Sequence, residues 1–178
     1  MENIDIEYVD FRDIAKRVCS GEIFIYPTDT VYGIGCNAMD ASAVKRVFEV
    51  KKRDKNKPLS PAFLHTAMML DYVHLKKGQA AEFSEKLPGP YTFIVKNKRM
   101  PKVVTGGLDT IGVRIPDYEF ILHLIKSSGI PIVTTSANIA GEEPTNEFNQ
   151  LSKEILEEVD FAIDAGKQGS DKPSMVIN

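Results

Sequence analysis

The chain has 178 residues and a formal net charge of −3, with 43% hydrophobic and 26% charged residues. These values are typical of one globular domain spanning residues 1–178, because a core of this length buries about 70% of the surface of the unfolded chain. They exclude disordered, collagen-like and coiled-coil proteins. The apolar stretches are much shorter than the roughly 20 residues that cross a bilayer, and the acidic N-terminus lacks the pattern of a secretory signal. We therefore expect a cytoplasmic protein with no membrane partner.

The first part of the chain predicts a helix followed directly by a strand. Asp10 precedes apolar residues at helical spacing as far as Val18, and Gly21 ends the helix. The apolar run at residues 23–26 predicts a buried strand, which Pro27 closes.

A second helix begins after Asp40, a capping residue, and places Val44, Val47 and Phe48 on one apolar face. Residues 64–87 indicate only short fragments of strand and helix. The remaining predicted elements are strands at 91–95 and 111–115, a helix opened by Asp117 and ended by Gly129, a strand at 130–133, a helix carrying Phe148, Leu151, Ile155 and Val159, and edge strands at 161–163 and 175–177.

This order predicts an α/β fold, a twisted open mixed sheet flanked by helices, because several strands follow one another without an intervening helix. Ligands of such sheets bind at the carboxyl ends of strands. Residues 28–30 and 134–138 are polar and follow two of the predicted strands. We expect both segments at the binding edge of the sheet.

Residues 51–57 form a cationic run, with Lys51, Lys52, Arg53, Lys55 and Lys57 against the single acid Asp54. Cations at a helix C-terminus contribute about 0.3–1 kcal/mol each, which explains one or two of these charges. Repulsion among the others predicts an anion, so we interpret the loop as a phosphate site. The small and hydroxyl residues at 134–141 predict a second anion contact, although a capped turn would use the same residue types.

Arg114 lies in an otherwise apolar strand and requires a partner, either a bound carboxylate or an internal acid. Asp29 is a candidate general base or a turn-forming residue. Residues 33–38 resemble a dinucleotide-binding fingerprint but lack its strand-to-helix context and its acid, so we interpret them as a strand that contains glycines. The sequence contains no P-loop motif. Cys19 and Cys36 are interpreted as buried thiols, and three histidines predict no zinc site.

Five motifs occur in order over roughly residues 9–178: Tyr26-Pro27-Thr28-Asp29-Thr30-Val31-Tyr32-Gly33-Ile34-Gly35, Lys51-Lys52-Arg53 with Lys57-Pro58-Leu59, Pro88-Gly89-Pro90-Tyr91-Thr92, Gly112-Val113-Arg114-Ile115-Pro116, and Thr135-Ser136-Ala137-Asn138. Together they resemble the YrdC/Sua5 family. The resemblance implies a YrdC-like fold and an L-threonylcarbamoyladenylate synthase, which makes threonylcarbamoyl-AMP and pyrophosphate from L-threonine, bicarbonate and ATP for the tRNA modification t6A.

The resemblance also implies the site residues. It assigns ATP contacts to Lys51, Arg53, Lys57, Thr110, Ser136 and Asn138. It assigns threonine contacts to Thr30, Arg114, Thr134 and Ser174, and no residue as a covalent nucleophile. Mg²⁺ is implied by the ATP chemistry. The implied partners are the tRNA t6A-modification machinery and tRNA or double-stranded RNA.

The chain departs from the family pattern at three places. Ala62 stands where a His is usual, Pro144 stands where a nucleotide-contacting Ser is often found, and the chain stops at Asn178, before the usual C-terminal Arg segment. The run Lys57-Pro58-Leu59-Ser60-Pro61 resembles a divergent, YciO-like branch.

Two alternatives to the synthase stay open. One is a noncatalytic module that binds double-stranded RNA or tRNA through residues 51–57 and through a second basic run at residues 96–102. The other is a carbamoyl-transfer activity, as in the related domain of hydrogenase maturation proteins.

Overall fold

The computed structural model describes residues 1–167 and 175–177. Its larger sheet has six strands in the order β1-β9-β2-β3-β8-β4. The strands are β1 (Glu2–Asp5), β9 (Phe161–Asp164), β2 (Phe24–Tyr26), β3 (Gly33–Asn37), β8 (Ile132–Ser136) and β4 (Ser60–Ala62). β9 is parallel to β1 and β2, whereas β3 is antiparallel to β2 and to β8, so the sheet is mixed as predicted.

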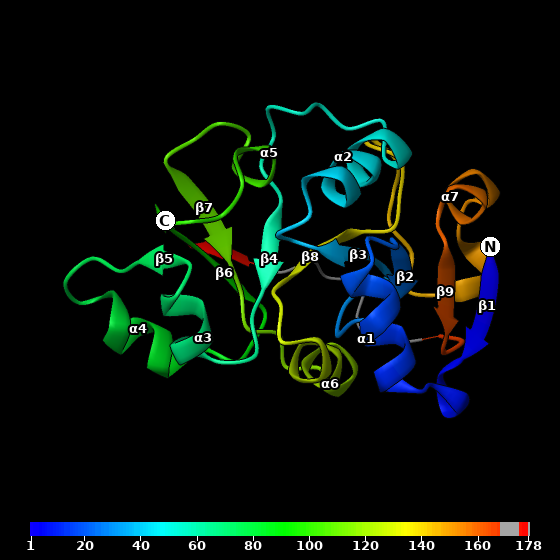
Figure 1. The fold of residues 1–178 in the computed structure, drawn as a ribbon, viewed down its shortest axis with the longest axis horizontal. Helices are drawn as coiled ribbons and strands as arrows, with labels where there is room; N and C mark the ends of the chain where they lie inside the picture. The colour runs from blue at the N-terminus through cyan, green and yellow to red at the C-terminus, as the bar shows by residue number, and fades with distance from the viewer. Residues whose placement is uncertain (168–174, 178) are drawn as a thin grey trace.

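A second, smaller sheet lies beside the first (Figure 1). In it β6 (Tyr91–Asn97) pairs with β10 (Met175–Ile177), β5 (Val73–His74) and β7 (Thr110–Val113). The strands thus form two open sheets, where the sequence indicated a single one. The two sheets meet where Ala62, at the end of β4, forms a parallel bridge with Arg114, just after β7.

Helices cover both faces of the larger sheet (Figure 1). On one face α1 (Phe11–Cys19) lies beside α6 (Glu119–Ser128), and on the other lies α2 (Ala41–Val50). The other helices are α3 (Thr66–Leu70), α4 (Gln79–Lys86), α5 (Lys102–Thr105) and α7 (Lys153–Glu158), with 3-10 turns η1 (Ile6–Tyr8) and η2 (Phe148–Gln150). No helix in the described part of the chain is long and apolar enough to cross a membrane.

Alternation along the strands divides the core into two clusters. Phe24 and Tyr26 pack with α1 and α6, whereas Ile23 and Ile25, on the opposite face, pack with α2 and with strands of the smaller sheet. Successive side chains of a strand point to opposite faces, so a fully apolar run such as residues 23–26 marks a strand covered on both sides. This physical reason made β2 recognisable in the sequence.

The helix ends match the sequence signals in most places. The Asp10 and Asp40 carboxylates accept hydrogen bonds from the first backbone amides of α1 and α2 and so cap them. Gly129 ends α6 in the left-handed conformation, with φ of 69°. Asp117, however, is not the cap of α6: Tyr118 occupies the N-cap position, and no side-chain cap is present there.

Two further expectations need correction. The predicted last helix is divided, because Leu151 is extended and separates η2 from α7. Cys36 is buried as expected, but Cys19, the last residue of α1, is exposed.

The strand directions bring the two expected polar segments together. β2 and β8 run in the same direction, since each is antiparallel to β3, and Gly33 pairs with both Tyr26 and Ser136. The turn after β2 and the carboxyl end of β8 therefore share one edge of the larger sheet, as predicted. That edge faces the junction between the sheets.

Candidate functional site

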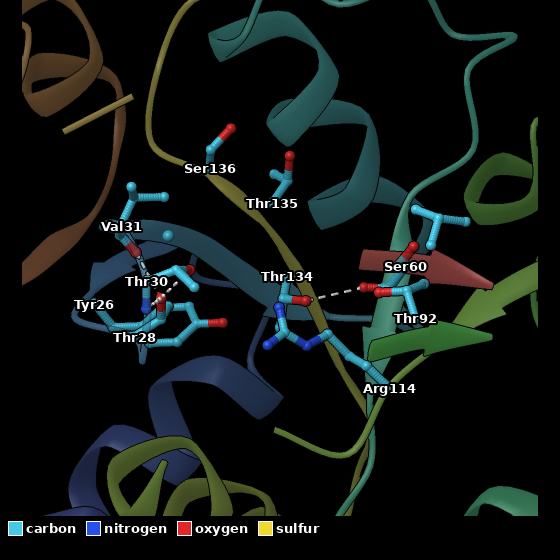
Figure 2. A pocket seen from close by; sticks show the side chains of 12 residues that line it. Tyr26, Thr28, Thr30, Val31, Ser60, Thr92, Arg114, Thr134, Thr135 and Ser136 are labelled. Atoms are coloured by element: carbon cyan, nitrogen blue, oxygen red, sulfur yellow. Dashed lines mark hydrogen bonds between the residues drawn. The ribbon is translucent and has the colours of Figure 1, made fainter. Parts of the chain in front are cut away.

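A cavity of about 220 Å³ opens at this junction. Figure 2 shows its lining from the turn after β2, from β4, from β6 and from β8, with Arg114 between the two sheets. Most of the lining side chains carry hydroxyls: Tyr26, Thr28, Thr30, Ser60, Thr92, Thr134, Thr135 and Ser136. Among the described residues, the cavity thus offers many neutral hydrogen-bonding groups around one cation.

Arg114 is the dominant charge in this cavity. It is 9% exposed, and its Nη2 donates to Asp29 Oδ1 at 3.3 Å. Its Nε is buried with no hydrogen-bond partner among the described residues. A buried donor left unpaired costs about 1–3 kcal/mol, so the guanidinium retains capacity for an acceptor. The internal acid that the sequence left open is Asp29, but it satisfies only part of the guanidinium.

Asp29 is held by the local structure of its turn. The Thr28 hydroxyl accepts the Thr30 amide at 3.0 Å and donates to the Val31 carbonyl at 2.6 Å. The hydroxyls of Thr28 and Thr30 are 3.1 Å apart. These bonds order the turn without a ligand, and they place the Asp29 carboxylate beside Arg114.

Tyr26 and Thr134 flank the guanidinium (Figure 2). Burial raises the pKa of the Tyr26 phenol, although the nearby Arg114 charge opposes that shift, so Tyr26 is a neutral donor near pH 7. The Thr134 hydroxyl donates to the Ser60 carbonyl at 3.2 Å. The absence of a side chain at Gly112 leaves space for Ser60 in this wall, because a Cβ at Gly112 would lie 2.6 Å from the Ser60 hydroxyl.

Lys51 has a different place from the one its sequence context suggested. It is 2% exposed and does not line the cavity. Its ammonium donates to the carbonyls of Ser136 and Asn138 and to the Asn138 side-chain oxygen. The carbonyl of Lys51 accepts the Ala140 amide at 2.8 Å. Lys51 therefore clamps the loop that follows β8.

Three other cations of the run, Lys52, Arg53 and Lys55, also have partners inside the protein. Lys52 pairs with Glu154 and Lys55 with Glu49. Arg53 is partly buried and donates to the carbonyls of Lys57 and Pro58, and burial lowers the pKa of its guanidinium. Carbonyl oxygens and acids of the chain therefore already neutralise part of the charge of this run, so repulsion alone does not require an anion there.

Two of the run's charges nevertheless remain available. The Lys57 side chain is exposed, and its ammonium has no hydrogen bond or ion pair within the described part of the chain. Arginine has five N–H donors, and the two carbonyls that Arg53 contacts do not use them all. A phosphate contact by these two residues stays a prediction.

The loop after β8 is closed by its own side chains. The Ser136 hydroxyl, which lines the cavity, donates to the Asn138 side-chain oxygen. The side-chain nitrogen of Asn138 donates to the Glu142 carbonyl. The capped turn considered as an alternative is thus present. It does not exclude a ligand, because one residue of the turn faces the cavity.

The structure brings together Thr30, Arg114, Thr134 and Ser136 around one cavity. It does not place Thr110 there, since Thr110 is exposed at the start of β7. Ser174 lies outside the described residues. The sequence reasoning missed the hydroxyls of Tyr26, Ser60, Thr92 and Thr135. Tyr26, Thr92 and Thr135 lie within the recognised motifs and Ser60 lies in the run at residues 57–61, so membership of these segments was the available signal.

Ala62, at the position where a His was expected, is fully buried and belongs to the core cluster of Ile132 rather than to the cavity wall. The second basic run, at residues 96–102, is partly used in packing. The Arg99 guanidinium lies 4.5 Å from the centre of the Tyr72 ring, and Lys98 contacts the Leu70 carbonyl.

A family model for Sua5, YciO and YrdC proteins, described as "Telomere recombination", matches residues 16–178. A Pyrococcus abyssi threonylcarbamoyl-AMP synthase is 36% identical over 97% of this chain and 52% of its own length. A Vibrio campbellii threonylcarbamoyl-AMP synthase is 27% identical over 94% of this chain and 92% of its own length. The chain thus spans about half of the first relative and nearly all of the second.

Solved structures of Sua5 and YciO proteins are also similar to this chain. The crystal structure of P. abyssi Sua5 complexed with L-threonine has a TM-score of 0.88 and 34% identity, covering 99% of this chain and 53% of that one. The crystal structure of Escherichia coli YciO has a TM-score of 0.85 and 26% identity, covering 99% of this chain and 88% of that one. The order of strands and helices described above is therefore that of known structures.

Proposed function

The chain belongs to the Sua5/YciO/YrdC family, and we propose on that premise that it is a threonylcarbamoyl-AMP synthase. The substrates are L-threonine, bicarbonate and ATP, and the products are threonylcarbamoyl-AMP, pyrophosphate and water. The reaction is a nucleotidyl transfer that supplies the t6A modification of tRNA. The P. abyssi relative, of which the chain covers 52%, and the V. campbellii relative, of which it covers 92%, both carry the synthase name, which supports this activity.

One observation carries the proposal: the cavity holds a buried arginine with an unpartnered Nε next to a carboxylate. An α-amino acid is a zwitterion, so its carboxylate complements Arg114 and its ammonium complements Asp29. A planar guanidinium binds a carboxylate through two parallel hydrogen bonds. The hydroxyls of Thr30 and Thr134 lie on the same wall and would bind a hydroxyl-bearing side chain such as that of threonine.

The size of the cavity separates the two substrates. Pockets for drug-sized ligands have volumes of about 300–1,000 Å³, whereas this one has about 220 Å³. It accommodates an amino acid but not a whole nucleotide. ATP would therefore lie outside the cavity mouth, past Ser136, with its phosphates towards Arg53 and Lys57. Thr110 and Asn138 remain proposed nucleotide contacts on the strength of the family pattern alone.

The chemistry requires alignment more than a nucleophile from the protein. The threonine ammonium first gives a proton to Asp29 or to water; the free amine then attacks the carbon of bicarbonate, and loss of water leaves a carbamate. A carbamate oxygen then attacks the α-phosphorus of ATP, and the bond to the pyrophosphate oxygen breaks with its electron pair. Fixing the carboxylate on Arg114 would aim the amine, and hence the carbamate, at the cavity mouth. Cations there would stabilise the charge of the transferring phosphate.

Magnesium would enter this site with the nucleotide. Mg²⁺ is commonly held by one or two carboxylates together with substrate phosphates. The described residues contain no cluster of three potential metal-binding side chains, and the nearest candidate carboxylate, Asp29, is engaged with Arg114. The residues present fit a metal held mainly by phosphate oxygens, whose role would be to neutralise charge.

The test is pyrophosphate release by the purified chain, measured with each substrate omitted in turn. We expect release only when threonine, bicarbonate and ATP are all present. Arg53→Ala should weaken ATP binding and leave threonine binding unchanged, whereas Arg12→Ala, which removes an exposed arginine on α1, should change neither. Absence of pyrophosphate release in protein that still binds ATP would show that this chain is not a synthase.

A further inference from the structure

Lys51 is buried at the end of α2 and faces oxygen atoms that carry no net charge. It is 2% exposed, and its three ammonium contacts are the Ser136 carbonyl, the Asn138 carbonyl at 2.7 Å and the Asn138 side-chain oxygen at 3.1 Å. An ammonium has three N–H donors and no more. All three are used inside the protein, so Lys51 has no donor left for a phosphate.

The clamp acts on both sides of a peptide bond next to the cavity. The carbonyl of Ser136 accepts from Lys51, while the amide of Ala137, in the same peptide unit, donates to the Tyr32 carbonyl at 2.7 Å. The amide and carbonyl of a trans peptide point in opposite directions. This peptide unit is therefore held at both ends, between α2 and β3.

The peptide unit between Asn138 and Ile139 is held at one end only. Lys51 holds the Asn138 carbonyl, but the Ile139 amide, which points the opposite way, has no hydrogen bond to any described residue. Buried backbone amides are nearly always paired with protein, water or ligand. Ile139 as a residue is 9% exposed, and its amide is a donor that no described residue uses. Its direction is set by the carbonyl that Lys51 holds.

We infer that Lys51 is a positioning residue: it holds the Ser136 and Asn138 carbonyls so that the Ile139 amide is directed at a phosphate of the bound nucleotide, which Lys51 itself does not touch. The inference rests on the proposed function for the identity of the ligand. It changes the role of Lys51 from an ATP contact to the support of a backbone anion site. Backbone amides of loops are a common source of hydrogen bonds to phosphate oxygens.

The clamp depends on the protonated form of Lys51. Burial first, and the charge of Arg53 second, lower the pKa of Lys51 to about 8. Arg53, on the adjoining loop, is the charged group that acts on the ammonium among the described residues, and the loop after β8 presents only neutral oxygens to it. As pH rises through about 8, the ammonium loses a proton and with it one of three donors.

Global stability should not follow the same pH dependence. A lysine in the unfolded chain has a pKa of about 10.4, so between the two pKa values the unfolded state binds more protons than the folded state. The linkage relation then makes the contribution of Lys51 to the free energy of unfolding rise with pH in this interval. A loss of nucleotide affinity in the same interval would therefore report on the loop and not on unfolding.

The experiment compares Lys51→Met, Lys51→Arg and the control Lys45→Met, which removes an exposed lysine from the same helix. Hydrogen exchange of the amides at residues 136–142 is measured without substrate, and ATP and threonine affinities are measured by calorimetry at several pH values. In Lys51→Met we expect loop exchange and the ATP dissociation constant each to rise about tenfold or more, the equivalent of one lost charge-assisted hydrogen bond. Threonine affinity should not change, and the control should behave as wild type.

The pH series gives a second criterion, which does not require Lys51→Met to fold. Wild-type ATP affinity should fall as pH rises through about 8, whereas Lys51→Arg should bind ATP with no such transition, because arginine does not titrate. Weaker ATP binding by Lys51→Met with unchanged loop exchange would mean direct contact and overturn the inference. Wild-type and Lys51→Arg proteins with the same pH dependence would also overturn it. If wild-type protein binds no ATP at any pH, the proposed function fails, and loop exchange still tests the clamp.

Discussion

Replacing Arg114 with lysine separates the geometry of the guanidinium from its charge. The Arg114 Nε is buried and unpaired among the described residues, and Nη2 makes one contact of 3.3 Å to Asp29. An unpaired buried donor costs about 1–3 kcal/mol, which a bound carboxylate would recover. Lysine keeps the charge beside Asp29 but has no planar fork. We therefore expect the threonine dissociation constant to rise about 5- to 150-fold, since 1.4 kcal/mol corresponds to a factor of ten.

The assay is titration calorimetry with threonine and, separately, with ATP, whose affinity should stay at the wild-type value. Arg46→Lys is the matched control, because Arg46 makes a two-point contact with Asp160 far from the cavity lining. That variant should lose some thermal stability and no threonine affinity. Folded Arg114→Lys protein that binds threonine as tightly as wild type would refute the assignment of Arg114 as the carboxylate ligand.

The remaining predictions concern stability. Gly35→Ala should lower the free energy of unfolding by about 1–3 kcal/mol in urea titrations, because its Cβ would lie 2.7 Å from the buried Phe24 ring; an unchanged midpoint would contradict this. Burial opposes the charge of Asp160, but hydrogen bonds from Arg46 and a backbone amide outweigh it and lower its pKa. The contribution of Asp160 to the free energy of unfolding is therefore present above the unfolded pKa of about 3.9 and is lost as pH falls through the folded pKa. In thermal melts, the Asp160→Asn protein should therefore lose less stability on acidification than the wild-type protein does. Gly106→Ala should destabilise the protein, because φ there is 60° and its Cβ would lie 2.6 Å from a backbone oxygen.

The fold was largely predictable where one signal was strong and local. The apolar run at residues 23–26 and the capping residues Asp10 and Asp40 predicted elements that the structure contains. The short elements β5 (Val73–His74) and α5 (Lys102–Thr105) were not predictable, because they are too short for a periodic pattern and depend on pairing and packing with distant segments.

The site was predictable in part for a related reason. The motifs identified Thr30, Arg114, Thr134 and Ser136, and the structure gathers all four around one cavity. The role of each residue in the cationic run was not predictable, because a list of charges does not say which carbonyls or acids each charge will face. Lys51 shows this most clearly: its three partners lie 85 or more positions away in the chain.

The sequence by itself determined the mixed α/β class, the edge of the sheet where the polar segments meet, and the residue types found there. Those properties follow from hydrophobic periodicity and from the order of elements, which local stereochemistry controls. Only the tertiary structure decided that Asp29 faces Arg114, that the strands form two sheets that meet at Ala62, and that Lys51 supports a loop. These outcomes depend on which distant segments meet, because burial and pairing decide whether a charged side chain is left for a ligand or used within the fold.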